Sequence, residues 1–474
     1  MTLPARTATV PLFGGRPAGR VVAWRAGVPV RADRLLADAQ ALAERLPARG
    51  QPVNLCTDRY AFAVGLVATL LRGQTSLMPP NTLPATLAQL QGDGPPPYAL
   101  VDAGTAGDAA AAELAGLPAV AVGAFAADDP VPVPAEPELA ADLSAVCLLT
   151  SGSTGPPQAH HKRWGALLLN IAAEAERLAT LLGRPDLDGL NIVATVPAQH
   201  SYGFESTVLL GLLGGAAFDS GRPFYPADIV AALERLPRPR ALVTTPFHLK
   251  TLLGAGLALL PVDLLLSATA PLSPQLAAEA EAATGGRLIE IYGCTEAGQV
   301  ASRRTTDGEV WTTLGALTLA READADGADV FVVQGGHVLE PTPLADVLEL
   351  IDARRFRLLG RANDLIRVAG KRSSLAHLNF HLNRVAGVTD GAFWLPSDDG
   401  SGVARTVAFV VAPGRSAREI VASLRAHVEP AFLPRRVVQV AALPREATGK
   451  LTAGALAAFA RATLGEPLEP QGEG

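Results

Sequence analysis

The most constraining feature of this sequence is a regular alternation of short apolar runs with longer helix-type segments along most of the chain. Apolar runs bounded by turn residues and separated by helical patterns are typical of helices that cover a largely parallel sheet. The expected strands are residues 52–56, 99–102, 119–122, 145–150, 191–196, 241–244, 264–267 and 287–291, and the expected helices are residues 58–71, 163–182 and 205–213. The sequence therefore predicts an α/β protein.

The pattern changes twice along the chain. Residues 123–142 are rich in Ala, Asp and Pro and are expected to form a loop, and the polar segment 319–329 marks a change to shorter, alternating strands. From Arg361 onward a smaller α+β unit is expected. We therefore predict two domains, residues 1–360 and residues 361–474. The later expected elements are strands 330–333, 347–351, 403–411 and 436–440 and helix 417–427.

Composition excludes several classes of function. The chain has 474 residues, 49% of them hydrophobic, which is enough to bury a substantial core. Its 46 acidic and 40 basic residues give a net charge of −6, which offers no support for nucleic-acid binding. The apolar run 61–71 is too short to cross a membrane, no signal-peptide pattern opens the sequence, and Cys56, Cys147 and Cys294 lack metal or disulfide spacing. We expect a cytoplasmic protein with no nucleic-acid or membrane partner.

A cluster of hydroxyl and glycine residues follows the expected strand 145–150. It consists of Thr150, Ser151, Gly152, Ser153, Thr154 and Gly155. Backbone N–H groups and hydroxyls in such a turn can converge on an anion. The Lys-Ser/Thr ending of a Walker A loop is missing, and an ordinary Gly/Ser turn remains an alternative.

Three further motifs follow in order. Residues 291–297 (IYGCTEA) combine a tyrosine that can stack on a base, a threonine for a phosphate oxygen and a glutamate for Mg²⁺. Residues 359–372 (LGRANDLIRVAGKR) form a turn, strand and basic turn, and residues 444–451 (PREATGKL) place a lysine where a loop could deliver it to a phosphate. Taken singly, these motifs also fit a strand-end turn and a solvated lysine.

Together, TSGSTG, YGxTE, GRxxDxIRxxGKR and PRxxTGK closely resemble the adenylate-forming superfamily, which includes acyl- and aryl-CoA ligases, adenylation domains and luciferases. The resemblance covers roughly residues 52–451. It implies a large N-terminal domain with a small mobile C-terminal lid. It also implies that a carboxylic acid is activated with ATP and Mg²⁺ to acyl-AMP. The acyl group then passes to a thiol of coenzyme A or of the phosphopantetheine on an acyl carrier protein.

The resemblance also implies a role for individual residues. The cluster from Thr150 to Gly155 would cradle phosphates, with Ala268, Thr269, Ala270, Tyr292 and Gly293 around the nucleotide. Asp346 and Arg361 would bind the ribose, Thr295 the α-phosphate, and Glu296 the Mg²⁺. Lys450 would bridge the carboxylate and the α-phosphate, and Asn363 would be the hinge. The family places a lysine where this chain has Gln158. Lys162 either replaces that lysine or is a surface residue at the start of a helix.

The acid site is expected at residues 197–204, with His200, Tyr202, Phe204 and Ser267 as candidates; for Phe204, core packing is an equally good interpretation. The pattern around Lys162 is similar to that of ligases from aryl-polyene and xanthomonadin-type pigment clusters, which implies a hydroxybenzoate or related aryl acid. The basic cluster at residues 354–372 could meet the phosphates of coenzyme A or an acidic carrier protein, or form a solvated strand edge. A fatty-acid-type ligase and a non-catalytic nucleotide-binding scaffold are the alternative functions.

Overall fold

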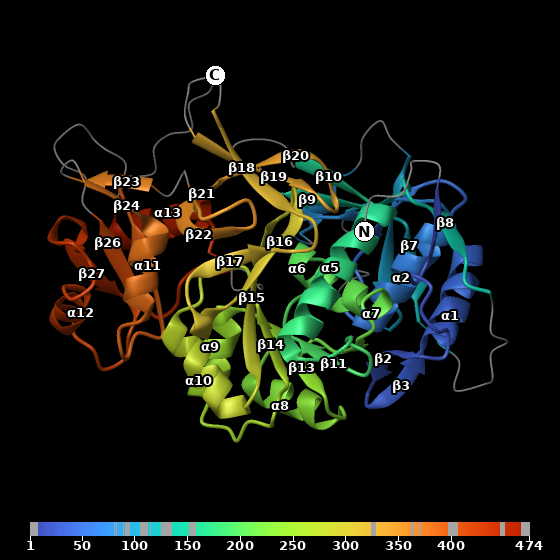
Figure 1. Ribbon diagram of the computed structural model, residues 1–474, viewed down its shortest axis with the longest axis horizontal. Coiled ribbons are helices and arrows are strands. Elements are labelled where there is room, and N and C mark those ends of the chain that lie inside the picture. Colours follow the sequence, from blue (N-terminus) through green and yellow to red (C-terminus); the bar gives the residue numbers. More distant parts are fainter. Residues whose placement is uncertain are drawn as a thin grey trace.

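The computed structural model shows a mixed α/β molecule built from layered sheets and helices, with a smaller group of C-terminal elements beside them (Figure 1). The structure describes residues 8–465 except 80, 82, 89, 91–94, 105–111, 114, 124, 126–134, 151–157, 324–328, 362–364, 369–370, 397–405 and 446–450. Within the described ranges, no helix combines the length and the apolar character needed to cross a bilayer. The predicted fold class is confirmed.

The first sheet has six strands in the order β10-β9-β5-β4-β6-β7. Its neighbouring strands are parallel, except that β10 pairs antiparallel with β9. Helix α2 begins after Asp58, whose side chain accepts a hydrogen bond from the backbone N–H of Ala61. The elements are α1 (Ala32–Arg45), β4 (Gln51–Asn54), α2 (Arg59–Leu71), β5 (Ser76–Met78), α3 (Pro84–Ala88), β6 (Pro97–Asp102), β7 (Ala119–Val122), β9 (Ser144–Thr150) and β10 (Gln158–Arg163).

The second sheet has eleven strands in the order β21-β22-β17-β16-β15-β14-β13-β11-β12-β2-β3. Its central strands, from β15 to β2, are parallel, and both ends are antiparallel. The strands are β2 (Val21–Arg25), β3 (Val28–Arg31), β11 (Asn191–Ala194), β12 (Ala217–Asp219), β13 (Arg240–Thr244), β14 (Leu264–Ser267), β15 (Arg287–Cys294), β16 (Gly298–Arg304), β17 (Val310–Thr313), β21 (Asp346–Leu350) and β22 (Arg355–Arg361).

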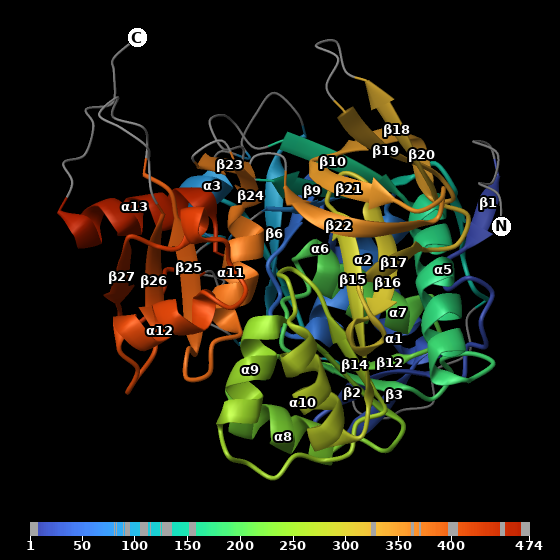
Figure 2. The ribbon, with the colours of Figure 1, turned by 60° about the vertical axis from the view of Figure 1, so that its left-hand side comes forward.

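The second sheet is buried on both faces. Along β14, Leu264 and Leu266 join the core shared with the first sheet, whereas Leu265 joins the core under α8, α9 and α10 (Figure 2). A strand that is covered on both faces has an unbroken run of apolar residues, so the sequence pattern predicted β14. The helices are α5 (Trp164–Leu182), α6 (Ser201–Gly203), the π-helical turn η1 (Phe204–Leu209), α7 (Leu210–Leu212), α8 (Pro226–Glu234), α9 (Pro246–Gly254) and α10 (Pro274–Thr284).

One prediction about segment boundaries was wrong. Within the expected loop 123–142, strand β8 (Glu138–Ala140) pairs with β1 (Thr9–Pro11), a partner too distant in sequence to foresee. The polar segment 319–329 contains most of strand β18 (Thr318–Ala323), which pairs antiparallel with β19 (Asp329–Gly335). Polar residues on exposed positions are usual in an edge strand such as β18. The sheet is completed by β20 (Val338–Leu344), and η2 (Thr305–Asp307) follows β16.

The C-terminal elements contain their own hydrophobic cores around the sheet β25-β26-β27. The Lys250 ammonium on α9 donates to the carbonyl oxygens of Val388 (2.5 Å) and Asn383 (3.4 Å), which joins this unit to the second sheet's helices. The elements are β23 (Leu365–Val368), β24 (Lys371–Ser374), α11 (Leu375–Asn383), β25 (Asp390–Trp394), β26 (Val407–Val411), α12 (Ala417–Leu424), η4 (Pro430–Phe432), β27 (Arg436–Gln439) and α13 (Ala453–Leu464).

Candidate active site

The turn between β15 and β16 carries the YGCTE motif. The two strands are antiparallel, and a bulge interrupts their register at Tyr292 and Gly293. A Cβ atom at position 293 would lie 2.3 Å from the carbonyl oxygen of Gly298, so a larger residue would push the strands apart. The glycine therefore fixes the shape of the turn that presents Thr295 and Glu296.

Residues expected to hold the nucleoside come together although they belong to different motifs. The Tyr292 hydroxyl donates a 2.7 Å hydrogen bond to Asp346 Oδ2. The ring of Tyr292 is only 9% exposed and packs against Trp311 and Phe356, which orient it. Asp346 is also the register partner of Arg361 across β21 and β22. Tertiary folding thus places the three residues at one edge of the sheet.

Glu296 lies at the tip of the turn, with its side chain 45% exposed. Two residues on β10 contact it: the His160 Nε2 atom lies 4.0 Å from Glu296 Oε1, and the Lys162 Nζ atom donates to the Glu296 carbonyl oxygen at 2.7 Å. Lys162 is therefore not a freely solvated lysine. Whether it replaces the lysine missing at position 158 stays a prediction.

Several predicted site residues lie outside the described residues: Ser151, Gly152, Ser153, Thr154, Gly155, Asn363 and Lys450. The side chains of Thr150 and Arg361 are likewise outside the description, although their backbones belong to β9 and β22. Because Thr150 pairs with Gln158, residues 151–157 connect the ends of an antiparallel pair. The chain returns along β10 toward the Glu296 turn.

Two of the expected acid-site residues, Tyr202 and Ser267, meet at the end of β14. The Tyr202 hydroxyl donates to the carbonyl oxygen of Leu266 at 2.8 Å, and Ser267 follows directly in the same strand. His200 is the residue before helix α6, which begins at Ser201. Phe204 is fully buried and packs edge-to-face on Phe62, so its side chain belongs to the core.

The segment after β14 contains a strained residue. Thr269 has a φ of 78°, a conformation that side-chain-bearing residues rarely adopt. It stands between Ala268 and Ala270, the three residues expected to approach the nucleotide. Strain of this kind is concentrated at ligand sites, where the surrounding structure holds it in place.

A buried polar network beneath the turn was missed by the sequence analysis. Ser206 Oγ donates to Glu174 Oε1 at 2.7 Å and accepts from Gln299 Nε2 at 2.9 Å. Burial raises the pKa of Glu174 to about 8, so its carboxyl is largely protonated at neutral pH. The sequence did contain one indication of this network, which is the charged residue Glu174 within the largely apolar helix α5.

Comparison with known proteins identifies the family. Residues 98–326 match the model of the AMP-binding enzyme family. A 4-coumarate–CoA ligase of Halorhodospira halophila is 31% identical over 285 residues, which cover 59% of this chain and 67% of that protein. A 4-coumarate–CoA ligase of Rhodobacter capsulatus is 33% identical over 280 residues, covering 59% of this chain and 66% of that ligase.

The chain belongs to the adenylate-forming superfamily of AMP-binding enzymes. Solved structures share its fold at low identity. ATP-bound MatB from Rhodopseudomonas palustris superposes with a TM-score of 0.76 at 18% identity, covering 97% of this chain and 99% of the other. The anthranilate CoA ligase AuaEII with anthranoyl-AMP gives 0.77 at 16% identity, covering 94% and 95%.

The residues of this superfamily member fit a magnesium ion that is shared with a nucleotide. Among the side chains that the structure describes, no three His, Cys, Asp or Glu residues are grouped to hold a metal ion alone. Magnesium in nucleotide sites is commonly held by one or two carboxylates together with phosphate oxygens. In such a site the exposed Glu296 carboxylate would be the protein's ligand.

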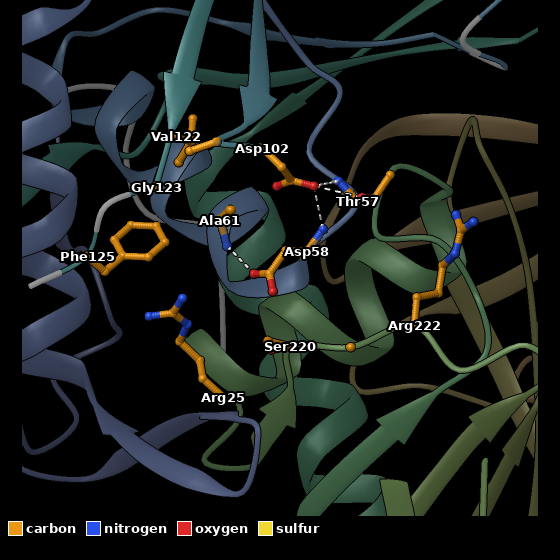
Figure 3. Close-up of a pocket in the computed structure, with 12 residues that line it drawn as sticks. Arg25, Thr57, Asp58, Ala61, Asp102, Val122, Gly123, Phe125, Ser220 and Arg222 are labelled. Carbon is orange, nitrogen blue, oxygen red and sulfur yellow. Dashed lines mark hydrogen bonds between the residues drawn. The ribbon is translucent and has the colours of Figure 1, made fainter. Parts of the chain in front are cut away.

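A cavity of about 560 Å³ lies apart from these residues, at the carboxyl ends of β4, β6, β7 and β12 (Figure 3). Asp102 Oδ2 accepts bonds from Thr57 and from the Asp58 N–H on its wall. The buried Arg59 donates to carbonyl oxygens of Val196 and Gly221, so it joins this wall to the strand that precedes the acid segment. None of the predicted site residues lines this cavity.

Proposed function

We propose that this adenylate-forming enzyme joins a carboxylic acid to AMP, releases pyrophosphate, and then transfers the acyl group to the thiol of coenzyme A. The observation that carries the proposal is the 2.7 Å hydrogen bond between Tyr292 and Asp346. This bond places Tyr292, the candidate for stacking on the base, next to Asp346, the candidate for binding the ribose. Two relatives named 4-coumarate–CoA ligase support both the reaction and the acceptor.

The chemistry requires activation because a carboxylate is a poor electrophile and has no good leaving group. The carboxylate oxygen attacks the α-phosphorus, the bond to the bridging oxygen breaks, and pyrophosphate leaves with that electron pair. Thr295 would hold the α-phosphate, Lys450 would neutralise charge between the carboxylate and that phosphate, and Glu296 would hold Mg²⁺. A bound Mg²⁺ ion supplies charge neutralisation on the phosphates. The acceptor thiolate then displaces AMP from the acyl carbon.

The acid we propose is an aryl acid with a hydroxyl group, such as a hydroxybenzoate. Next to the Leu266 carbonyl to which Tyr202 donates, the buried Ser267 Oγ makes no hydrogen bond within the described residues. Leaving such an atom unpaired costs about 1–3 kcal/mol. A phenolic hydroxyl could satisfy it, whereas a fatty-acid tail could not.

A carrier protein is the second candidate acceptor. The described arginines of the basic cluster already have partners within the chain: Arg355 pairs with Asp352, Arg357 pairs with Glu349, and Arg354 donates to the Gly315 carbonyl oxygen. Exposed ion pairs of this kind are weak and can exchange partners. The choice between the two thiols is therefore an experimental question.

The proposal is tested by acid-dependent pyrophosphate release with Mg-ATP. The panel pairs 4-hydroxybenzoate with benzoate and 4-methylbenzoate, and adds 4-coumarate and a fatty acid, each with and without coenzyme A. We expect 4-hydroxybenzoate to exceed 4-methylbenzoate by at least tenfold and coenzyme A to stimulate turnover. If no acid gave pyrophosphate release, the result would contradict the proposed activity and favour a nucleotide-binding scaffold.

The role of Lys450 is tested in the same assay. Lys450→Ala is expected to lower acid-dependent pyrophosphate release at least 100-fold while ATP binding, measured by calorimetry, changes little. Undiminished turnover would overturn the role given to this lysine.

A further inference from the structure

Lys162 connects two parts of the chain that are expected to hold the nucleotide. It lies on β10, the strand that leaves the phosphate-loop segment, and its ammonium donates to the carbonyl oxygen of Glu296. A hydrogen bond from a charged donor is stronger than one between neutral groups. This bond is a direct mechanical link from β10 to the turn between β15 and β16.

A buried carboxyl lies behind the lysine. Glu205 on η1 is 1% exposed, and the charge of Lys162 opposes the effect of burial on its pKa. The Asn170 and Ser201 side chains also bond to Glu205. Burial lowers the pKa of Lys162, while Glu205, Cys294 and Glu296 act to keep it charged. These groups favour the charged form of Lys162, which is the form that donates to the Glu296 carbonyl.

The space around this pair depends on a glycine at the start of β16. Gly298 has a φ of 80°, and a Cβ atom there would lie 3.3 Å from Asn170 Nδ2 and 3.7 Å from Glu205 Oε1. The start of β16 therefore packs against Glu205 of η1, whose charge acts on Lys162 of β10. The same residues support the end of the turn that follows Glu296.

We infer that Lys162 is a positioning residue that sets the distance between the phosphate-loop strand and the Glu296 turn, and thereby the affinity for magnesium-bound nucleotide. The inference rests on the proposed function, in which Glu296 meets Mg²⁺ and residues 150–155 meet phosphate. If the link is removed, the turn loses its hydrogen bond to Lys162 and retains the longer, 4.0 Å contact of Glu296 with His160. The Glu296 carboxylate then becomes less well placed relative to the phosphates.

The test compares ATP binding to the full chain by calorimetry with Mg²⁺ and with EDTA. Because Lys162→Met alone leaves Glu205 buried without a cation and could prevent folding, the informative variant is the double substitution Lys162→Met with Glu205→Gln. We expect its half-saturating Mg²⁺ concentration to rise at least fivefold. Its affinity for ATP in EDTA should stay within twofold of wild type.

Two controls separate positioning from general support of the fold. Glu205→Gln alone retains the Lys162–Glu296 bond, so its half-saturating Mg²⁺ concentration should stay near that of wild type. Lys162→Arg keeps a charged donor at this position, so its half-saturating Mg²⁺ concentration should lie closer to wild type than that of the double variant. An unchanged magnesium dependence in the double variant would overturn the inference alone, as would equal losses with and without Mg²⁺. A wild-type protein that binds no ATP would overturn the proposed function and this inference with it.

Discussion

At the scale of single residues, the proposed nucleoside site depends on contacts between groups that are distant in sequence. Tyr292 stands at the end of β15 and Asp346 at the start of β21, and their hydrogen bond fixes both side chains at one edge of the sheet. The aromatic packing of Tyr292 on Trp311 and Phe356 limits the rotamers of its ring. The site is therefore organised before any ligand binds.

Tyr292→Phe should weaken nucleotide binding without disturbing the fold. It removes one hydrogen bond to Asp346, worth about 0.5–1.5 kcal/mol. We expect the dissociation constant for ATP, measured by calorimetry, to rise roughly 3- to 10-fold, with the melting temperature nearly unchanged. Tyr225→Phe is the matched control because Tyr225 is 67% exposed. Equal effects in the two variants would contradict the role of the bond to Asp346.

At the scale of elements, close backbone approach shapes the β15–β16 turn. Gly293 lies against the Gly298 carbonyl, and no rotamer change can relieve an added Cβ because the obstacle is backbone. The helix ends show the opposite case, in which small residues have open space around them. An added Cβ is costly at Gly293 because two backbones meet there, and at Gly183 and Gly285 because the backbone is left-handed although the space around it is open.

Gly293→Ala should displace the turn that carries Thr295 and Glu296. The added methyl would meet the carbonyl oxygen at 2.3 Å, so we expect acid-dependent pyrophosphate release to fall at least tenfold and the protein to lose about 1–3 kcal/mol of stability. Gly254→Ala on α9 is the control, since nothing lies within 4 Å of a Cβ there. A Gly293→Ala variant with full activity would show that the turn tolerates the shift.

The histidines of α11 give the C-terminal unit a pH dependence. The ring of His381 lies 4.5 Å from that of His377 and 5.5 Å from that of His427. Burial, followed by His377, Arg384 and His427, lowers the pKa of His381 to about 4. The unfolded chain, with a pKa near 6.5, therefore binds the proton first as the pH falls.

We expect the free energy of unfolding to decrease between about pH 6.5 and pH 4, since in that window only the unfolded state carries the proton on His381. His381→Gln should reduce the difference in urea-unfolding free energy between pH 7 and pH 5. His161→Gln, an exposed histidine on β10, serves as the comparison. If both variants retained the wild-type difference, the histidine cluster would not be its source.

At the scale of the whole molecule, polar groups join the C-terminal unit to α9. Lys250 donates to Val388 and Asn383, and Arg445, which lies over the ring of Phe247, also pairs with Asp390. These contacts are polar, unlike the apolar cores inside each part.

Lys250→Met should loosen the contact between α9 and the C-terminal unit. Loss of a charged hydrogen bond, about 1.5–3 kcal/mol, should speed hydrogen exchange at the amides near Val388 roughly tenfold or more. Exchange within β14 should not change. Lys250→Arg is expected to retain much of the protection. Unchanged exchange near Val388 in the methionine variant would show that other contacts hold the unit.

Much of this protein could be predicted from its sequence. Parallel strands buried on both faces appear as continuous apolar runs, so the α/β class and most of the central strands were recognisable, as were the four ordered motifs. The predicted helix at 205–213 overlaps a helical segment from Ser201 to Leu212 that includes a π-helical turn. Local pattern carries this information because it records which faces are buried.

Only the tertiary structure decided which distant groups meet. The pairing of β8 with β1, the bond from Tyr292 to Asp346, the lysine link to Glu296 and the network of Glu174, Ser206 and Gln299 all join residues far apart in the chain. Polar side chains leave no periodic signature, because their place is set by their partners and not by a repeating face. The sequence by itself determined the layers and the motifs, and folding determined the contacts between them.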